Sequence, residues 1–529
     1  MLNSPTSGFT EERFARWMET WADSLDTMVG WKDLVRYRDI SAMDVGYLHF
    51  YFRILEQLRH EISRESGAEA PALVPARGPV GLARLVRIGQ RLRSGEMSWA
   101  DGIQIASERA AHRCRMLFSP VTLKDLRGAR TALVVRAGRN PTGYSVLEAL
   151  QNEFGWRIQF ASWTSSVAPR LHALGIPYVH LGDVYGRRLG RWRREHAQDI
   201  SVACEKLDTR QLSETLAEII GTRIRTDLLP LVRHVCCEAR VYTDVYFDLF
   251  SHVRPEVIIL FNEITISERA AARIAGRAGL KSIAIQHGLF IGYVYRSLPT
   301  DRIIVWGRLP REFWLAQGCS TEQVISVGGF GHENWPDVAK YFQVETATDR
   351  RPTVLVLGQN PAWFMSPQLR RESLRAVFDA ATRLKSLRFV IKVHPGETPG
   401  SYEKEVQVRG LGNVEIYTSG DLLDFLRPAQ VVVSIFSTAG LEAMLVGVPV
   451  IVLNPVPEPS LAPYAPATVI AGDGPALAQA IDRILMDAQY RDMLISSGRE
   501  YAAAYIGPLD GKAATRAGLV IERFAGSNA

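Results

Sequence analysis

Long hydrophobic runs are missing from the 529-residue sequence, and no apolar stretch approaches the ~20 residues that a membrane-spanning helix needs. The N-terminus lacks the basic and then apolar layout of a secretory signal. The five cysteines form no Cys-x-x-Cys pair and have no histidines at zinc-ligand spacing, which argues against a disulfide scaffold or a zinc module. We therefore expect a cytoplasmic protein that meets a membrane only from its surface.

The chain also lacks a large excess of one charge. It has 62 Lys and Arg against 56 Asp and Glu, which gives a net charge of only +6. Such a mild bias fits a protein that handles anionic ligands. The most basic stretch, residues 187–194, contains five arginines and is typical of a solvated helix face. It would also suit an anionic membrane or a phosphate-rich acceptor. No aromatic-lined or zinc module accompanies these arginines, so nucleic acid is not an expected partner.

The length predicts more than one domain, because a single hydrophobic core stops growing near ~250–300 residues. Residues 1–125 are predicted to be a helical N-terminal extension, since apolar residues recur there at helical spacing. The first such stripe consists of Phe14, Trp17, Met18, Trp21, Leu25 and Met28. We expect these helices to cap the first domain, with binding to a membrane or a partner protein as the alternative.

Two series of short, apolar, β-branched runs follow, separated by helical stretches, which is typical of parallel sheets buried on both faces. The first series falls in residues 126–335 and consists of Ala132–Val135, Arg157–Phe160, Tyr178–Leu181, Val257–Phe261, Ser282–Ile285 and Ile303–Trp306. The second falls in residues 336–529, before a helical tail, and consists of Thr353–Leu357, Phe389–Val393, Val414–Tyr417, Val431–Ile435, Val450–Leu453 and Thr468–Ile470. The prediction is an α/β protein with two Rossmann-like, doubly wound domains that face a cleft.

Ligands of open parallel sheets bind at the carboxyl ends of the strands, so the candidate site residues are those that follow each run. The strongest candidates are Ser437 and Thr438, at a strand-to-helix turn. The N–H groups of that turn and the two hydroxyls suit a phosphate, and Gly440 lets an anion approach the backbone. Glu442 is expected to accept hydrogen bonds from the two hydroxyls of a ribose. The alternative is that Ser437 or Thr438 only caps the helix.

Two other segments of the second domain end at the same edge of the predicted sheet. His394 ends a strand and Pro395 stops it, which directs His394 and Lys392 toward the cleft. An imidazole there can bind a phosphate or act as an acid on a leaving group, unless this histidine is structural. Gly358 and Gln359 follow the first strand, where a glycine lets a ligand come close to the backbone, although the full GxGxxG pattern is absent.

The first domain offers candidates for a general base and for acceptor binding. His287, before Gly288, is a candidate base for an acceptor hydroxyl, with a buried histidine bonded to the backbone as the alternative. Glu263, after another strand, is a rival base. Arg139 and Asn140 follow the first strand and are candidate acceptor-binding residues. No DxD motif follows a strand, so we expect neither a metal nor another cofactor.

The pairs His394-Pro395 and Ser437-Thr438 together resemble motifs of bacterial GT-B transferases of surface-polysaccharide assembly. These are the capsule Kdo transferases, the bacterial sialyl- and polysialyltransferases and the teichoic acid glycerophosphotransferases, in which both motifs hold the phosphates of a cytidine nucleotide donor. His287-Gly288 looks similar to the His-Gly motif of the teichoic acid enzymes, whose histidine is thought to be the base. The sialyltransferases use a carboxylate, for which Glu263 is the nearest candidate. The chain lacks the Asp-Tyr motif of the teichoic acid enzymes and the acidic motif of the sialyltransferases. The identity of the general base therefore stays open between His287 and Glu263.

The resemblance implies a GT-B glycosyltransferase that moves a sugar from a nucleotide donor, CMP- or CDP-linked, to a surface glycan or a lipid-linked saccharide without a metal. One alternative is a sugar-nucleotide 2-epimerase on the same fold, although that chemistry needs more carboxylates than the predicted cleft offers. The other is a module without catalytic activity that binds a glycan or a partner enzyme. Working at the inner face of the membrane, the enzyme would meet its acceptor by peripheral contact.

Overall fold

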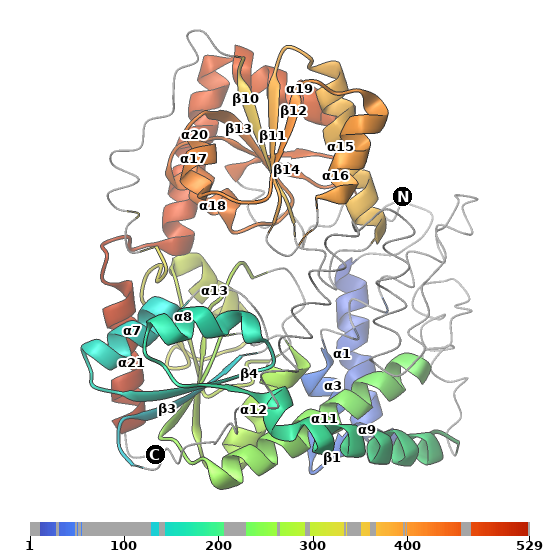
Figure 1. Ribbon diagram of the computed structural model, residues 1–529, viewed down its shortest axis with the longest axis vertical. Helices are drawn as coiled ribbons and strands as arrows, with labels where there is room; N and C mark the ends of the chain where they lie inside the picture. The colour runs from blue at the N-terminus through green and yellow to red at the C-terminus, as the bar shows by residue number, and fades with distance from the viewer. Residues whose placement is uncertain are drawn as a thin grey trace.

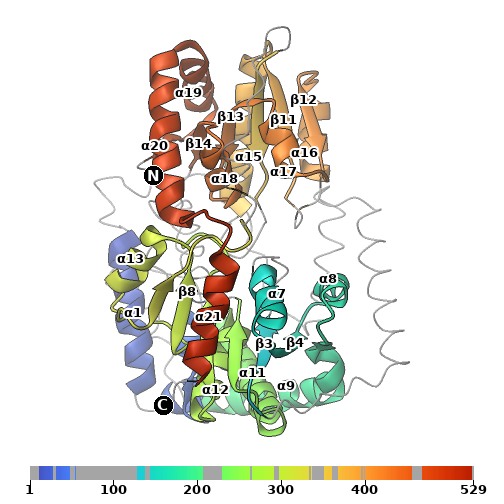
Figure 2. The ribbon, with the colours of Figure 1, turned by 90° about the vertical axis from the view of Figure 1, so that its left-hand side faces the viewer.

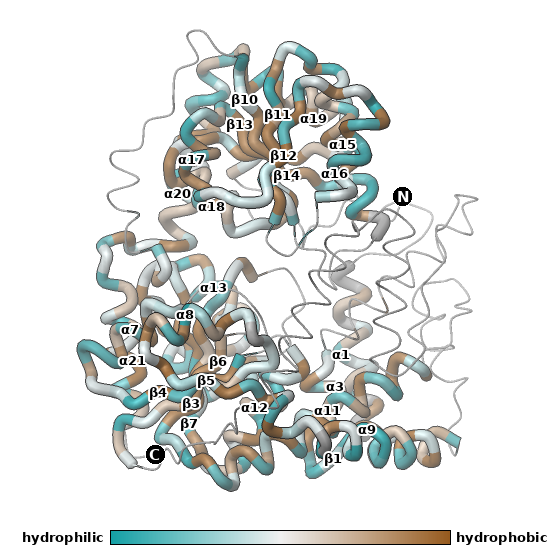
Figure 3. Tube along the Cα trace, in the orientation of Figure 1, coloured by the Kyte–Doolittle hydropathy of each residue, from teal (hydrophilic) through white to brown (hydrophobic). Residues whose placement is uncertain are grey.

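The computed structural model describes residues 11–27, 31–47, 50, 54, 128–136, 143–205, 229–261, 265–290, 297–332, 335, 351–359, 367–394, 397, 399–455 and 467–526. Within them lie two large sheets, placed one beyond the other along the long axis of the molecule (Figure 1). Hydrophobic residues gather along the central strands of each sheet, as Figure 3 shows, because both faces of each sheet are covered by helices.

The first sheet has seven strands in the order β5-β4-β3-β6-β7-β8-β9, and every neighbouring pair is parallel. Its strands are β3 Thr131–Arg136, β4 Arg157–Ser162, β5 Tyr178–His180, β6 Val257–Leu260, β7 Lys281–Ile285, β8 Arg302–Val305 and β9 Val324–Ser326. Each predicted run of the first series coincides with one of these strands. The edge strand β9 was not predicted.

The second sheet has six parallel strands in the order β12-β11-β10-β13-β14-β15. They are β10 Thr353–Leu357, β11 Arg388–Lys392, β12 Val414–Tyr417, β13 Ala429–Ser434, β14 Val450–Leu453 and β15 Val469–Ala471. In both sheets the first strand is central, the next two run outward on one side, and the chain then returns to build the other side. This is the doubly wound order of Rossmann-type domains, so the predicted fold class is confirmed.

Helices connect the strands and cover both sheets. In the first half they are η1 Ser165–Val167, α7 Tyr144–Asn152, α8 Ala168–Ala173, α9 Leu181–Glu205, α11 Leu229–His252, α12 Ile266–Arg277 and α13 Arg308–Ala316. In the second half they are α15 Pro367–Arg383, α16 Gly400–Arg409, α17 Leu422–Leu426, α18 Ala439–Leu445, α19 Gly474–Met486 and α20 Ala488–Ile506.

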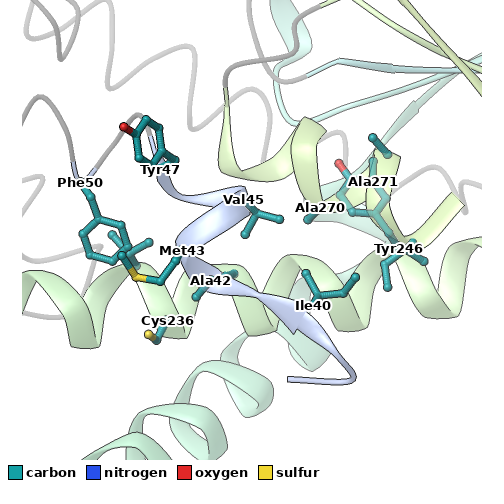
Figure 4. Close-up of a cluster of buried hydrophobic side chains, with 14 of the residues drawn as sticks. Ile40, Ala42, Met43, Val45, Tyr47, Phe50, Cys236, Tyr246, Ala270 and Ala271 are labelled. Atoms are coloured by element: carbon teal, nitrogen blue, oxygen red, sulfur yellow. The ribbon is translucent and has the colours of Figure 1, made fainter. Parts of the chain in front are cut away.

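The described part of the N-terminal region packs into the core of the first half. It comprises α1 Glu11–Thr27, α2 Trp31–Val35, the strands β1 Arg36–Tyr37 and β2 Ile40–Ser41, and α3 Ala42–Val45. The small hairpin of β1 and β2 was not predicted. The described members of the predicted stripe, Phe14 to Leu25, are buried in one cluster with residues of α11 and α12, part of which Figure 4 shows. The described helices of this region thus pack on the first domain.

The last helix, α21 Ala513–Gly526, differs from the predicted division of the chain, which placed the tail with the second domain. It packs on α7 of the first half, beside the first sheet (Figure 2). Glu522 accepts hydrogen bonds from Arg130 at 2.9 Å and from the indole of Trp156 at 2.5 Å. Buried Ala517 and Ile521 join the core of the first sheet. Apolar residues of this helix find their complementary surface there, which sequence order alone does not indicate.

Candidate active site

The carboxyl ends of the two sheets meet between the two halves of the molecule. A Cβ atom at Gly288, after β7, would lie 3.6 Å from Oγ1 of Thr438, after β13. In the second sheet β10 and β13 are neighbours from which the chain leaves in opposite directions, and such a switch point is where doubly wound sheets bind ligands. Gly358 and Ser437 follow these two strands. The structure thus brings the predicted His-Gly and Ser-Thr segments together at a switch point.

The Ser437-Thr438 turn is compact and leads directly into α18. The N–H of Ala439 donates to Oγ of Ser437 at 3.3 Å, and the N–H of Gly440 donates to the carbonyl of Ser437 at 2.9 Å. Thr438 is the cap residue of α18, but its hydroxyl makes no capping hydrogen bond. The Ser437 hydroxyl thus accepts from the backbone at the start of α18, whereas the Thr438 hydroxyl lies opposite Gly288.

A buried carboxylate holds the loop that carries His394. Glu397, with a side chain only 1% exposed, pairs with Arg370 at 2.7 Å and accepts hydrogen bonds from the hydroxyl of Tyr402 at 2.9 and 3.1 Å. It also accepts from the backbone N–H of His394 at 3.1 Å. A side chain at Gly358 would collide with this carboxylate and with the His394 backbone, so the two loops approach closely because that residue is glycine.

His394 follows β11 by two residues, and Lys392 at the end of that strand acts on it electrostatically. Burial, and then the charge of Lys392, hold the pKa of the half-buried His394 below its ordinary value of 6.5. The Lys392 ammonium lies 5.6 Å from the centre of the Phe425 ring. An uncharged imidazole at pH 7 can donate one hydrogen bond to a phosphate, and a bound anion would favour its protonated form.

Gln359 lies deeper than its neighbour Gly358. Its side chain is 8% exposed and lines a cavity of about 30 Å³ together with Ser373, Arg370 and Glu397. Among the described residues, neither Oε1 of Gln359 nor Oγ of Ser373 has a hydrogen-bond partner. A cavity of this size has room for a water molecule and not for a nucleotide. Gln359 thus forms part of the inner wall behind the site.

On the opposite side, the loop of His287 is fixed by its preceding residue. The fully buried side chain of Gln286 donates to the carbonyl of Gly288 at 2.8 Å and accepts from the N–H of Trp306 at 2.7 Å. Gln286 thereby ties the end of β7 to the end of β8, and half-buried His287 sits on this braced loop. The bracing role of Gln286 was not predicted.

Glu442 has a partner that the sequence did not indicate. His332, which follows the Gly-rich stretch after β9, places Nε2 3.0 Å from Oε1 of Glu442. His332 therefore links the first half of the molecule to the helix α18 of the second. A lone histidine after a glycine run has no periodicity or motif that would have singled it out.

Three predicted residues, Glu263, Arg139 and Asn140, lie outside the described residues, so their roles stay predictions. Across the ranges that the structure describes, no group of three His, Cys, Asp or Glu side chains is placed to hold a metal ion. No described helix is both long and apolar enough to cross a bilayer. In the arginine run, Arg188, Arg191 and Arg193 of α9 pair with Asp248, Glu195 and Glu238.

Two Rossmann-type domains with ligand edges that face each other define a GT-B fold. A family model described as "Putative glycosyltransferase (DUF6716)" matches residues 334–456, which contain β10 to β14 and the turns that follow them. No curated protein sequence matches the chain.

Solved structures with a similar arrangement include epimerases and a glycosyltransferase. They are a putative UDP-N-acetylglucosamine 2-epimerase from Listeria monocytogenes (14% identity, 74% of this chain and 95% of that chain, TM-score 0.48), a UDP-GlcNAc 2-epimerase from Neisseria meningitidis bound to UDP-GlcNAc (12%, 74% and 100%, 0.45) and a glycosyltransferase from Rickettsia africae (11%, 76% and 100%, 0.45).

Proposed function

We propose that this protein is a glycosyltransferase that transfers a sugar from a nucleotide donor to a hydroxyl of a saccharide acceptor. The observation that carries the proposal is the meeting of Gly288 with Thr438, which joins the candidate base loop to the candidate phosphate turn. The family model over residues 334–456 supports the same class of activity.

In the proposed complex the donor lies on the second domain. Its phosphates contact the Ser437-Thr438 turn and His394, its ribose hydroxyls contact Glu442, and Gly358 lets the phosphate come close to the backbone. The acceptor lies on the first domain near Arg139 and Asn140. This arrangement would put the sugar between the two sheets, out of bulk water.

The proposed reaction is a displacement at the anomeric carbon. His287 or Glu263 removes the proton of the acceptor hydroxyl, whose oxygen bonds to the anomeric carbon. The bond from that carbon to the phosphate oxygen breaks, and its electron pair leaves with the nucleotide. The Thr438 turn and His394 stabilise the charge that develops on the phosphate. We propose that these groups act without a metal ion, so activity should survive EDTA.

The resemblance to surface-polysaccharide transferases favours a CMP- or CDP-linked donor and a surface glycan or lipid-linked saccharide as acceptor. We propose that the enzyme works in the cytoplasm, in peripheral contact with the inner face of the membrane. A 2-epimerase would instead convert a UDP-sugar with no acceptor present, and a binding module would convert nothing. An assay with and without acceptor therefore separates the three activities.

The first test is the thermal unfolding of the full chain with excess CMP, CDP, UDP, GDP or ADP. A ligand that binds only the folded state raises Tm, and a hundredfold excess over Kd adds about 2.7 kcal/mol of stability. We expect CMP or CDP to raise Tm and the double variant Ser437→Ala/Thr438→Ala to lose this shift. A shift with UDP alone would change the donor class, and no shift with any nucleotide would refute the proposed site.

A matched control for the double variant lies elsewhere in the chain. Ser320 and Thr321 form another adjacent hydroxyl pair, exposed between α13 and β9. Ser320→Ala/Thr321→Ala should keep the nucleotide shift at its wild-type size. Equal losses in both double variants would assign the effect to general destabilisation.

A further inference from the structure

The pair of His332 and Glu442 is a polar contact between the two halves of the molecule at the proposed nucleotide site. His332 is 6% exposed and the Glu442 side chain is 21% exposed, so the pair is largely withdrawn from water. Glu442 is also the residue proposed to bind the ribose. The contact from His332 of the first domain can therefore affect how Glu442 binds the ribose of the donor.

His332 is held in place by its own surroundings. Its ring packs edge-on against Trp306, with ring centres 5.5 Å apart, and lies 5.9 Å from the ring of Trp335. The backbone N–H of His332 donates to the carbonyl of Gly329 at 3.0 Å. This bond closes a turn in which Gly331 has φ of 82°. The imidazole therefore presents Nε2 to Glu442 from a fixed direction.

The direction of the hydrogen bond between His332 and Glu442 follows from the chemistry of the two groups. Nδ1 of His332 is buried and has no hydrogen-bond partner among the described residues. A carboxylate can only accept, so Nε2 of His332 is the donor and Oε1 of Glu442 the acceptor of this hydrogen bond. No other side chain of the described residues binds this carboxylate, which leaves Oε2 available to a ligand.

We propose that His332 is a positioning residue for the donor: by binding Oε1 of Glu442 it fixes the carboxylate so that Oε2 accepts from a ribose hydroxyl. The inference rests on the proposed function, in which Glu442 reads the ribose. Because His332 belongs to the first half of the molecule, recognition of the ribose then depends on both domains being in place.

The test compares ribonucleotides with their 2′-deoxy forms by calorimetric titration of the full chain. The probes are CDP with 2′-deoxy-CDP and UDP with 2′-deoxy-UDP. Wild type should bind the ribonucleotide about tenfold more tightly, the ratio expected from one hydrogen bond to a charged group. In His332→Ala the ribonucleotide should lose most of this advantage, while the affinity for the deoxynucleotide stays unchanged.

Further variants make the result specific to the contact between His332 and Glu442. His332→Gln, which can still donate, should restore part of the preference, and Glu442→Gln combined with His332→Ala should cost no more than Glu442→Gln alone. His196→Ala is the matched control, because His196 is equally buried and donates to a carboxylate, Asp244, at 2.7 Å within the first half. It should leave the ribose preference at its wild-type value.

The outcomes distinguish the inference from the function on which it rests. If His332→Ala keeps the full preference for ribose, or weakens both nucleotides equally, the positioning role is refuted and the nucleotide site stands. If wild type binds none of the four probes, the proposed function fails and the inference fails with it.

Discussion

Asp44 in the first half of the molecule and Glu397 in the second are both carboxylates held by arginine, but they lie at opposite ends of their sheets. Asp44 of α3 pairs with Arg269 at 2.8 Å and Arg273 at 2.6 Å of α12, beside a cavity of about 520 Å³ at the amino ends of β7 and β8. Glu397 lies at the carboxyl end of the second sheet, in contact with the His394 loop.

The electrostatic balance of the two carboxylates differs. Burial alone would raise the pKa of Asp44, but Arg269 and Arg273 outweigh it and lower that pKa to about 2. For Glu397 burial prevails over Arg370, and its pKa is raised above the ordinary 4.5. The first carboxylate thus stabilises the attachment of the N-terminal segment. The second keeps a less favourable charge buried where it shapes the ligand edge, which is typical of a functional site.

The largest expected effect is on the attachment of the N-terminal segment. Asp44→Ala leaves Arg269, which is 2% exposed, with its charge uncompensated, so the free energy of unfolding should fall by about 3–5 kcal/mol. Urea unfolding of the full chain measures this. Because the folded pKa of Asp44 is depressed, the wild-type contribution should be present above pH 4 and be lost as the pH falls toward 2.

The neighbouring exposed pair provides the control for this variant. Arg277 pairs with Asp39 at 3.2 Å, with side chains 48% and 77% exposed. Arg277→Ala should change stability by less than about 1 kcal/mol, as exposed ion pairs do. A similar loss in both variants would contradict a special role for the buried network.

A smaller loss of stability, combined with a loss of binding, is expected in the second half. Glu397→Ala removes the acceptor of the His394 N–H and should lower the free energy of unfolding by about 2 kcal/mol. It should also weaken nucleotide binding about tenfold, because the loop of His394 loses its support. Glu397→Gln retains an acceptor for that N–H and should bind nucleotide better than Glu397→Ala. If Glu397→Ala bound nucleotide as tightly as wild type, Glu397 would be a structural carboxylate like Asp44, with no role at the ligand edge.

The smallest expected effect concerns the pH dependence of stability. The folded pKa of His394 lies below 6.5, so the unfolded chain binds the proton first and stability should fall as the pH drops through 6.5. Urea unfolding at pH 7.5 and 5.5 should show a smaller drop in His394→Gln than in wild type. Lys392→Gln should lie between the two, since burial is the larger cause. An identical drop in all three proteins would refute this assignment.

The strands and their ligand edges could be predicted from the sequence because a buried parallel strand consists of a run of apolar, β-branched residues. Val431–Ile435 and Val450–Leu453 are such runs. Once the end of a run is located, the residues at the ligand edge are the ones that come next in the sequence. The strand β9 was not predicted because its three residues include only two apolar side chains, Val324 and Ile325, which stand between the polar Gln323 and Ser326.

Contacts between segments distant in sequence could not be predicted. His332 is 110 residues away from Glu442, and neither residue stands in a pattern that points to the other. Glu397 follows His394 by only three residues. Its hydrogen bond with the His394 N–H is therefore a local contact, which the spacing in the sequence does indicate. For α21 the helical pattern was visible, but the surface on which it packs is made by residues near position 150.

The position of α21 has a consequence for the order in which the protein is made. The strands of the first sheet end at Ser326, whereas the helix that covers Trp156 and its neighbours begins at Ala513. At a translation rate of ~5–20 residues per second, about 10–40 s separate the synthesis of these two parts. During that interval the apolar surface beneath α21 faces water or a chaperone. The domain that is synthesised first is therefore completed last.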